Sequence, residues 1–308
     1  MPEIVISEFM DEAAIKRNFA GRDVLYDPEL VDQGPRLHAA LRDARALIVR
    51  NRTQVRGPLL DAAPELVVVG RLGVGLDNID VAACEARGIA VHPATGANNL
   101  SVAEYVITAA LMLLRRAWLA TDRVVAGQWP RNELMGRELA SKRLGLVGFG
   151  AIARETAGLA SGLGMTLGAS DPLLPADHPA WTRATRQSLD DLLATSDVVS
   201  LHVPLTASTR NMIDAAAIAR IKRGAILINA ARGGIVDELA LVAALRSGQL
   251  GGAALDVFAT EPVDAAYGER FAGAPNLLLT PHIAGVTEES NQRVSQVTAE
   301  AVLRHISA

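Results

Sequence analysis

The chain has 308 residues, of which 50% are hydrophobic and 21% are charged, and its formal net charge is −4. This length is sufficient for two domains of ordinary size, and the composition excludes a disordered protein. The small negative charge gives no support for binding to nucleic acid or to a membrane surface. The single cysteine, Cys84, excludes an internal disulfide and is typical of a reducing compartment.

The start of the chain lacks the basic and apolar pattern of a signal peptide. No uninterrupted apolar run is as long as a membrane-spanning helix requires. We therefore expect a cytoplasmic protein with no membrane partner, no nucleic-acid partner and no bound metal.

The N-terminal part alternates short apolar runs with helical segments. Buried parallel strands are predicted at 4–6, 24–26, 46–49, 66–70 and 90–92, with helical crossovers near 11–19, 37–43, 58–63 and 80–87. This alternation predicts a small doubly wound α/β domain.

Two groups in this part follow predicted strands, where ligands bind in such sheets. The closely spaced glycines of GRLGVGLDN (70–78) could offer backbone N–H groups to a ligand, although a tight turn explains them equally well. Arg50, Asn51 and Arg52 could join Arg71 at the same edge of the sheet. Solvated surface arginines are the alternative.

The segment PATGANNL (93–100) is rich in turn-forming residues and is predicted to be a linker between two domains. After it, Ser101 and Glu104 form a capping-box pattern that predicts a helix over 102–115. The region 117–143 is not obviously core, and we expect it to cover a partner subunit.

The segment 144–171 has the pattern of a nucleotide-binding βαβ unit, with strands at 144–147 and 165–170 and a helix at 152–163. Gly148 permits a tight turn, and Gly150 lets the backbone approach a pyrophosphate at the start of the helix.

Asp171 ends the second strand of this unit, where a carboxylate accepts hydrogen bonds from the adenosine ribose. A 2′-phosphate would meet a like charge at this position. The pattern therefore favours NAD over NADP.

Further strands are predicted at 198–203, 225–228, 252–257 and 277–279, and helices at 237–247 and 288–306. The last helix is expected to pack back on the first domain. Three titratable residues follow predicted strands: Arg232, Glu261 and His282. Each alone is also compatible with a turn or a surface ion pair.

Together these three side chains would suffice for hydride transfer to a 2-oxo acid. The reaction needs a cation that holds the substrate, a proton donor whose pKa is near 7, and a carboxylate that orients the donor.

Several segments resemble the D-2-hydroxyacid dehydrogenase family, above all its phosphoglycerate dehydrogenase-like branch. They are GRLGVGLDNID (70–80), NNLSVAEY (98–105), GLVGFGAIA (145–153) with Asp171, LHVPLT (201–206), INAARGGIVDE (228–238), ALDVFATEP (254–262) and TPHIAG (280–285). Two doubly wound parallel-sheet α/β domains are implied by this resemblance. One is a flavodoxin-like substrate-binding domain (1–97 plus 282–308), and the other is an NAD-binding Rossmann domain (98–281). Members of the family are usually homodimers.

The resemblance also implies roles for individual residues. Arg232 would bind and polarise the substrate, and Glu261 would pair with His282, the acid/base. The implied NAD contacts are Gly148, Phe149, Gly150, Ala151, Ile152, Asp171, His202, Val203, Pro204, Ala230, Arg232, Asp256 and His282. Among these, Asp256 would hold the nicotinamide carboxamide, and Val203 and Pro204 would flank the adenine. The implied substrate contacts are Arg50, Arg71, Val74, Gly75, Arg232 and His282. Asn51 and Arg52 are added as candidate substrate contacts because they follow the same predicted strand as Arg50.

The substrate is predicted to be a 2-hydroxy acid with an anionic 3-substituent, because three arginines exceed what a plain 2-oxo acid needs. A substrate like 3-phosphoglycerate is expected first, and (S)-sulfolactate, hydroxypyruvate and glyoxylate are alternatives. Formate dehydrogenases resemble the chain but have Gln where it has Glu261. An NAD-sensing corepressor is the alternative without catalysis.

Overall fold

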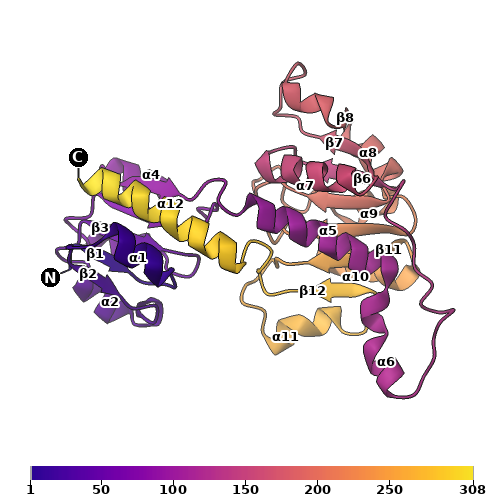
Figure 1. Ribbon diagram of the computed structural model, residues 1–308, viewed down its shortest axis with the longest axis horizontal. Helices are drawn as coiled ribbons and strands as arrows, with labels where there is room; N and C mark the ends of the chain where they lie inside the picture. The colour runs from indigo at the N-terminus through magenta and orange to yellow at the C-terminus, as the bar shows by residue number, and fades with distance from the viewer. Residues whose placement is uncertain (1, 308) are drawn as a thin grey trace. The chain divides into compact units, whose positions relative to one another are not determined.

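The computed structural model describes residues 2–307 of the chain. They form two compact units (Figure 1): one comprises the chain up to Asn98 and again from Val286 onward, and the other comprises Asn99–Gly285. No helix among the described residues is long and apolar enough to cross a membrane. Within the same residues, no group of three or more His, Cys, Asp or Glu side chains could hold a metal ion.

The first unit contains a five-stranded parallel sheet in the order β2-β1-β3-β4-β5, which is the flavodoxin-like order. Its strands are β1 (Ile4–Ile6), β2 (Val24–Tyr26), β3 (Ala46–Val49), β4 (Val68–Arg71) and β5 (Ala90–Pro93). Its helices are α1 (Glu12–Asn18), α2 (Gly34–Ala40), α3 (Pro58–Asp61), α4 (Val81–Ala86) and α12 (Glu288–Ile306), with a 3-10 turn, η1 (Leu30–Asp32).

Helix α12 returns the end of the chain to this first sheet, as predicted. It packs on β4, where a Cβ on Gly70 would lie 2.7 Å from side-chain carbons of both Thr298 and Val302. The helix can therefore approach the strand this closely only because residue 70 has no side chain. Val294 and Val302 share a buried cluster with alternate residues of β1 and β3, namely Ile4, Ile6, Ala46 and Ile48.

The second unit contains a seven-stranded parallel sheet in the order β12-β11-β10-β9-β6-β7-β8, a Rossmann-type order extended by one strand. Its strands are β6 (Arg143–Val147), β7 (Thr166–Ser170), β8 (Thr185–Arg186), β9 (Val198–Leu201), β10 (Ala225–Asn229), β11 (Leu250–Leu255) and β12 (Leu277–Leu279). The fold class predicted from the sequence, two doubly wound parallel-sheet domains, is confirmed.

Helices cover both faces of the second sheet. The helices of this unit are α5 (Asn99–Arg115), α6 (Thr121–Val125), α7 (Ala151–Gly162), α8 (Leu189–Thr195), α9 (Ala215–Arg220), α10 (Glu238–Ser247) and α11 (Ala265–Gly268), with 3-10 turns η2 (Ala117–Leu119), η3 (Pro179–Thr182) and η4 (Glu269–Phe271). Helices α5 and α7 share one buried cluster with the sheet. Helices α8, α9 and α10 share the other. The apolar runs of the central strands β9 and β10 are continuous because these strands are buried on both faces.

Several boundaries predicted from the sequence differ from those of the structure, and three of them affect the candidate site or its neighbouring helix. Helix α5 begins at Asn99, so Ser101 lies inside its first turn, buried, and does not cap the helix. Strand β9 ends at Leu201, and β11 ends at Leu255. Val203 and Asp256 therefore lie in the loops beyond these strands.

Candidate active site

The turn between β6 and α7 has the geometry of a pyrophosphate site. Gly148 has φ 87°, and a Cβ there would lie 2.6 Å from the carbonyl oxygen of His202, so only glycine fits. Gly150 is the N-cap of α7, where no side chain caps the helix and a Cβ would meet nothing within 4 Å. The N–H groups at Ala151 and Ile152 therefore begin a helix whose end is open to an anion.

Asp171 follows β7 and is tied to this turn. Its Oδ2 accepts a hydrogen bond from the backbone N–H of Phe149 (2.8 Å), and its Oδ1 accepts one from Leu173 (2.9 Å). The side chain of Phe149 is buried and stacks on Trp181, with the ring centroids 5.4 Å apart. Phe149 can thus reach a cofactor only through its backbone. Together the open helix end and the carboxylate fit a dinucleotide.

The loop after β9 carries three of the residues predicted to contact NAD. His202 shares a hydrogen bond of 2.9 Å with the hydroxyl of Ser200 through Nε2. Burial lowers the pKa of His202 to about 4, so its imidazole is neutral at neutral pH. Val203 is half-buried and Pro204 is exposed, which leaves their apolar side chains accessible to a flat ring.

The loop after β10 is shaped by Asn229, which the sequence analysis missed. Its buried amide accepts the N–H of Ala231 (3.1 Å) and donates to the carbonyl oxygen of Arg232 (2.9 Å). The guanidinium of Arg232 donates to the carbonyl oxygen of Ala231 (2.6 Å). Ala230 lies at the start of this loop and is half-buried.

Glu261 and His282, which come from the loops after β11 and β12, lie in direct contact. Oε2 of the carboxylate is 2.7 Å from Nδ1 of the imidazole, and Oε1 accepts the N–H of Phe258 at 2.9 Å. Burial opposes ionisation of Glu261, but these hydrogen bonds and the charges of His282 and Arg232 outweigh it and hold the pKa of the carboxyl below its usual value. Nε2 of His282 is left for a substrate.

Asp256 holds the loop on which His282 lies. This carboxylate is 1% exposed and accepts the N–H groups of Ile283 and Ala284, both at 2.8 Å. Thr280 donates its hydroxyl to the same carboxylate at 2.6 Å. His282 itself adopts the left-handed conformation, φ 57°, which is unusual for a residue with a side chain.

In the first unit, Glu8 organises the loop that carries the predicted arginines, although nothing in the sequence singled it out. Its buried carboxylate accepts the backbone N–H groups of Arg50 (2.8 Å), Asn51 (3.3 Å), Arg52 (3.1 Å) and Thr53 (3.0 Å). All four peptide groups therefore converge on one buried anion, which fixes the path of the loop.

The guanidinium groups of this unit have different environments. Arg50 donates to Asn291 at 2.6 Å and lies over the ring of Phe9, and burial lowers its pKa despite the opposing charge of Glu8. Arg52, in contrast, is exposed and forms an ion pair with Asp32.

Gly73 makes room for the remaining arginine. A Cβ on Gly73 would lie 1.7 Å from Nη1 of Arg71, so the guanidinium occupies the space that a side chain would need. The next two residues, Val74 and Gly75, have no acceptor for their N–H groups within the described chain.

Comparisons with known proteins agree with this geometry. Residues 107–284 match the NAD-binding domain of D-isomer specific 2-hydroxyacid dehydrogenases. The chain is 54% identical to an (S)-sulfolactate dehydrogenase of Chromohalobacter salexigens, over 99% of this chain and 98% of that protein. It is 36% identical to a D-3-phosphoglycerate dehydrogenase of Synechocystis sp. over 98% of its length, but spans only 54% of that relative. A D-lactate dehydrogenase from Aquifex aeolicus, solved with NAD and lactic acid, has a TM-score of 0.84 at 28% identity, and the match covers 99% of this chain and 95% of that chain.

The fold and the site define an NAD-dependent oxidoreductase that acts on the CH–OH group of a 2-hydroxy acid. The chain belongs to the D-isomer specific 2-hydroxyacid dehydrogenase family.

Asp171→Ala is expected to narrow the preference for NADH over NADPH, because it removes the charge that a 2′-phosphate would meet. A lost hydrogen bond to a charged group corresponds to about 1.5–3 kcal/mol, so KM for NADH should rise roughly 10- to 100-fold. Steady-state kinetics with both cofactors measure these effects, with the exposed Asp177→Ala as a control for loss of charge. Equal use of NADH and NADPH by the unsubstituted enzyme would contradict the role of Asp171.

Proposed function

We propose that the chain catalyses the NAD-dependent interconversion of (S)-sulfolactate and 3-sulfopyruvate. The observation that carries this choice is the 54% identity to a sulfolactate dehydrogenase over almost the whole of both chains. The phosphoglycerate dehydrogenase of Synechocystis is more distant, at 36%, and about half of it has no counterpart in the chain. The order of the candidates is thus reversed from that expected from the sequence.

The proposed chemistry needs three side chains of the second unit. Bound NAD supplies or accepts a hydride at C2 of the substrate. Arg232 holds the carboxylate and polarises the carbonyl group. His282 donates a proton from Nε2 to the alkoxide oxygen, and Glu261 orients the ring through Nδ1 and stabilises its charged form. A carboxylate in this position supports the proton transfer between His282 and the substrate oxygen that accompanies the interconversion of an alcohol and a ketone.

We propose that the first unit contributes further contacts to the carboxylate of the substrate and the contacts to its 3-substituent. The N–H groups of Val74 and Gly75 would bind the carboxylate, and Arg50 and Arg71 would bind the sulfonate through charge-assisted hydrogen bonds. Arg52 is less suited, because Asp32 already balances its charge.

The number of cations proposed to bind the 3-substituent favours a sulfonate over a phosphate ester. A sulfonate has one negative charge, whereas a phosphate ester has about 1.5–2 at neutral pH. Without Arg52, the cations proposed to bind this group are Arg50 and Arg71. Arg50 also lies near the buried carboxylate of Glu8, which reduces the positive potential available to a dianion.

3-Phospho-D-glycerate is the second candidate. It has the same configuration at C2 as (S)-sulfolactate, because the higher priority of sulfur changes only the label. The 36% identity to a phosphoglycerate dehydrogenase and the pair Arg50 and Arg71 favour it over uncharged 3-substituents. The intact pair of Glu261 and His282 argues against a corepressor that only senses NAD.

The first kinetic prediction concerns the acid/base. His282→Ala should lower kcat by roughly 10²- to 10⁴-fold, which is the usual contribution of a positioned general acid or base, while NADH still binds. Turnover and fluorescence titration with NADH measure the two properties. His178→Ala removes an imidazole that caps a 3-10 turn in the same unit and serves as the control. Near-normal turnover of the His282 variant would exclude the residue from the mechanism.

The second kinetic prediction concerns the 3-substituent. In the unsubstituted enzyme, kcat/KM should be highest for 3-sulfopyruvate, lower for 3-phosphohydroxypyruvate and lowest for hydroxypyruvate and glyoxylate. Arg71→Ala should raise KM for 3-sulfopyruvate roughly 10- to 100-fold through loss of a charged hydrogen bond, and affect hydroxypyruvate much less. Arg52→Ala is the matched comparison and should have the smaller effect. Equal kcat/KM for all four acids would refute the sulfonate site.

We also propose that the enzyme is a homodimer formed through the region 117–143, which contains α6. This segment extends away from the seven-stranded sheet (Figure 1), and Val125, Trp129 and Met135 are 84%, 81% and 74% exposed there. Three exposed apolar side chains so close in sequence are typical of an interface.

Trp129→Ser is expected to weaken the dimer at least tenfold, because buried tryptophans often contribute more than about 1.4 kcal/mol to an interface. Sedimentation equilibrium measures the dissociation constant. Leu173→Ser, which changes an exposed leucine elsewhere in the same unit, is the control. A monomeric unsubstituted protein at micromolar concentration would contradict the proposal.

A further inference from the structure

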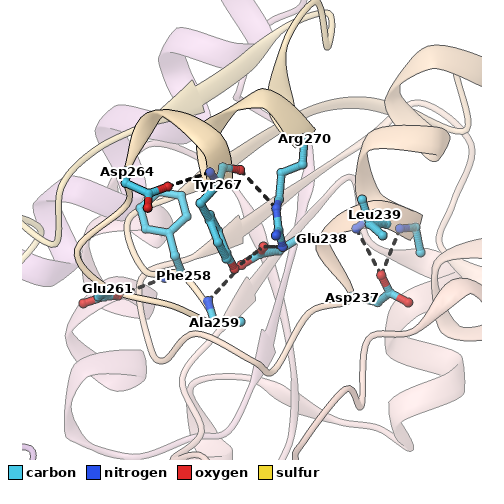
Figure 2. A network of polar contacts seen from close by, with 10 residues as sticks. Asp237, Glu238, Leu239, Phe258, Ala259, Glu261, Asp264, Tyr267 and Arg270 are labelled. Atoms are coloured by element: carbon cyan, nitrogen blue, oxygen red, sulfur yellow. Dashed lines mark hydrogen bonds and ion pairs between the residues drawn. The ribbon is translucent and has the colours of Figure 1, made fainter.

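A buried carboxylate that takes no direct part in the proposed chemistry lies behind the loop of Glu261. Glu238 is the first residue of α10 and is only 6% exposed. Figure 2 shows its carboxylate at the centre of a polar network. Oε1 accepts the backbone N–H of Ala259 at 2.9 Å, and Oε2 accepts the hydroxyl of Tyr267 at 2.7 Å and Nη1 of Arg270 at 3.1 Å.

The network holds the loop that carries Glu261. Two successive peptide N–H groups of this loop are each bound by a carboxylate: Phe258 donates to Glu261, and Ala259 donates to Glu238. On its other side the loop lies against the turn that follows Arg232, because a Cβ on Gly233 would be 1.7 Å from the carbonyl oxygen of Phe258. Glu238 therefore anchors the loop at Ala259, the residue next to the one whose N–H binds Glu261.

We propose that Glu238 is a positioning residue for the reaction: by holding the backbone at Ala259, it keeps the Glu261 carboxylate in hydrogen-bond contact with His282. This inference rests on the acid/base roles proposed for that pair. Glu238 is not among the residues proposed to contact NAD or the substrate, so its proposed role is to position Glu261. The other charged groups that face the pair are Arg232 and Asp256.

A carboxylate is required at position 238 because of the number of donors around it. A buried anion is stable only with charged or hydrogen-bonding partners, and Arg270 supplies the charge. The guanidinium of Arg270 also lies 3.5 Å from the centre of the Tyr267 ring. This contact holds the two side chains that donate to Glu238 next to each other. A glutamine has a single acceptor oxygen. It can serve either Ala259 or the pair Tyr267 and Arg270, but not both as the carboxylate does.

Glu238→Gln is the direct test. We expect kcat to fall roughly 10- to 100-fold, which is the cost of a misplaced catalytic group, with little change in the affinity for NADH. Reduction of a 2-oxo acid requires a protonated imidazole, so kcat/KM declines at high pH. If the Glu261 carboxylate moves away from His282, it stabilises the protonated imidazole less. The decline should therefore move to lower pH in Glu238→Gln than in the unsubstituted enzyme.

Asp237→Ala is the matched control. Asp237 caps the same helix by accepting the N–H groups of Leu239 and Ala240, both at 3.0 Å, and it has no hydrogen bond to the loop of Glu261. Figure 2 shows it pointing away from the Glu238 network. The variant should lose a few degrees of thermal stability, as expected for a missing N-cap, and keep the kcat and pH profile of the unsubstituted enzyme.

Tyr267→Phe supplies a milder variant that keeps the test decisive if Glu238→Gln does not fold. It removes one donor to Glu238, and we expect a two- to fivefold lower kcat and a smaller shift of the high-pH decline in the same direction. The inference is overturned if the variants that fold lose only thermal stability, as Asp237→Ala does, and keep kcat and the pH profile. Failure of the underlying roles is distinguishable, because His282→Ala and Glu261→Gln would then also retain full activity.

Discussion

The hydrogen bonds of the buried Asp256 carboxylate are the interactions on which the proposed active site depends. They bind the N–H groups of Ile283 and Ala284 and the hydroxyl of Thr280, so they hold the chain on both sides of His282. His282 lies between them with φ 57°, a conformation that costs about 1–2 kcal/mol for a residue with a side chain. Hydrogen bonds to a charged group contribute about 1.5–3 kcal/mol each and offset this cost. The backbone therefore determines where the imidazole points.

The same arrangement recurs at other loops of the two sheets: a carboxylate binds the peptide groups of a segment that follows a strand. Glu8 binds four successive N–H groups after β3, Asp171 binds the turn after β6, and Glu238 binds the loop after β11. Parallel strands end with unpaired peptide groups at the edge where ligands bind, and a buried carboxylate both satisfies them and fixes the loop. Each loop is thus rigid before any ligand arrives, which reduces the entropy lost on binding.

The sequence predicted the elements of the fold well because covered parallel strands are continuous apolar runs, as the fully buried β3 at Ala46–Val49 illustrates. The residues of the candidate site were also predictable, since motifs such as TPHIAG directly follow strands. The carboxylates that support the loops were not. Glu8 and Arg50 are 42 positions apart, and no local pattern indicates that they meet. The pairing of Arg52 with Asp32 likewise depends on the folded chain, and it reduced the cations available for a substrate from three to two.

The two carboxylates nearest His282 are distinguished by their environments. Burial raises the pKa of Asp256 despite its three hydrogen bonds, whereas the pKa of Glu261 is lowered by its contacts with His282 and Phe258 and by the charge of Arg232, which outweigh its own burial. When neighbouring groups have pKa values shifted in opposite directions, their roles usually differ. The oxygens of Asp256 accept two backbone N–H groups and the hydroxyl of Thr280, so this carboxylate fixes the conformation of the loop. Glu261 directs Oε2 at Nδ1 of the imidazole and keeps its charge to lower pH. In the proposed mechanism, the anion that would stabilise a protonated His282 is therefore Glu261, and Glu238 would keep that contact in place by holding the loop at Ala259.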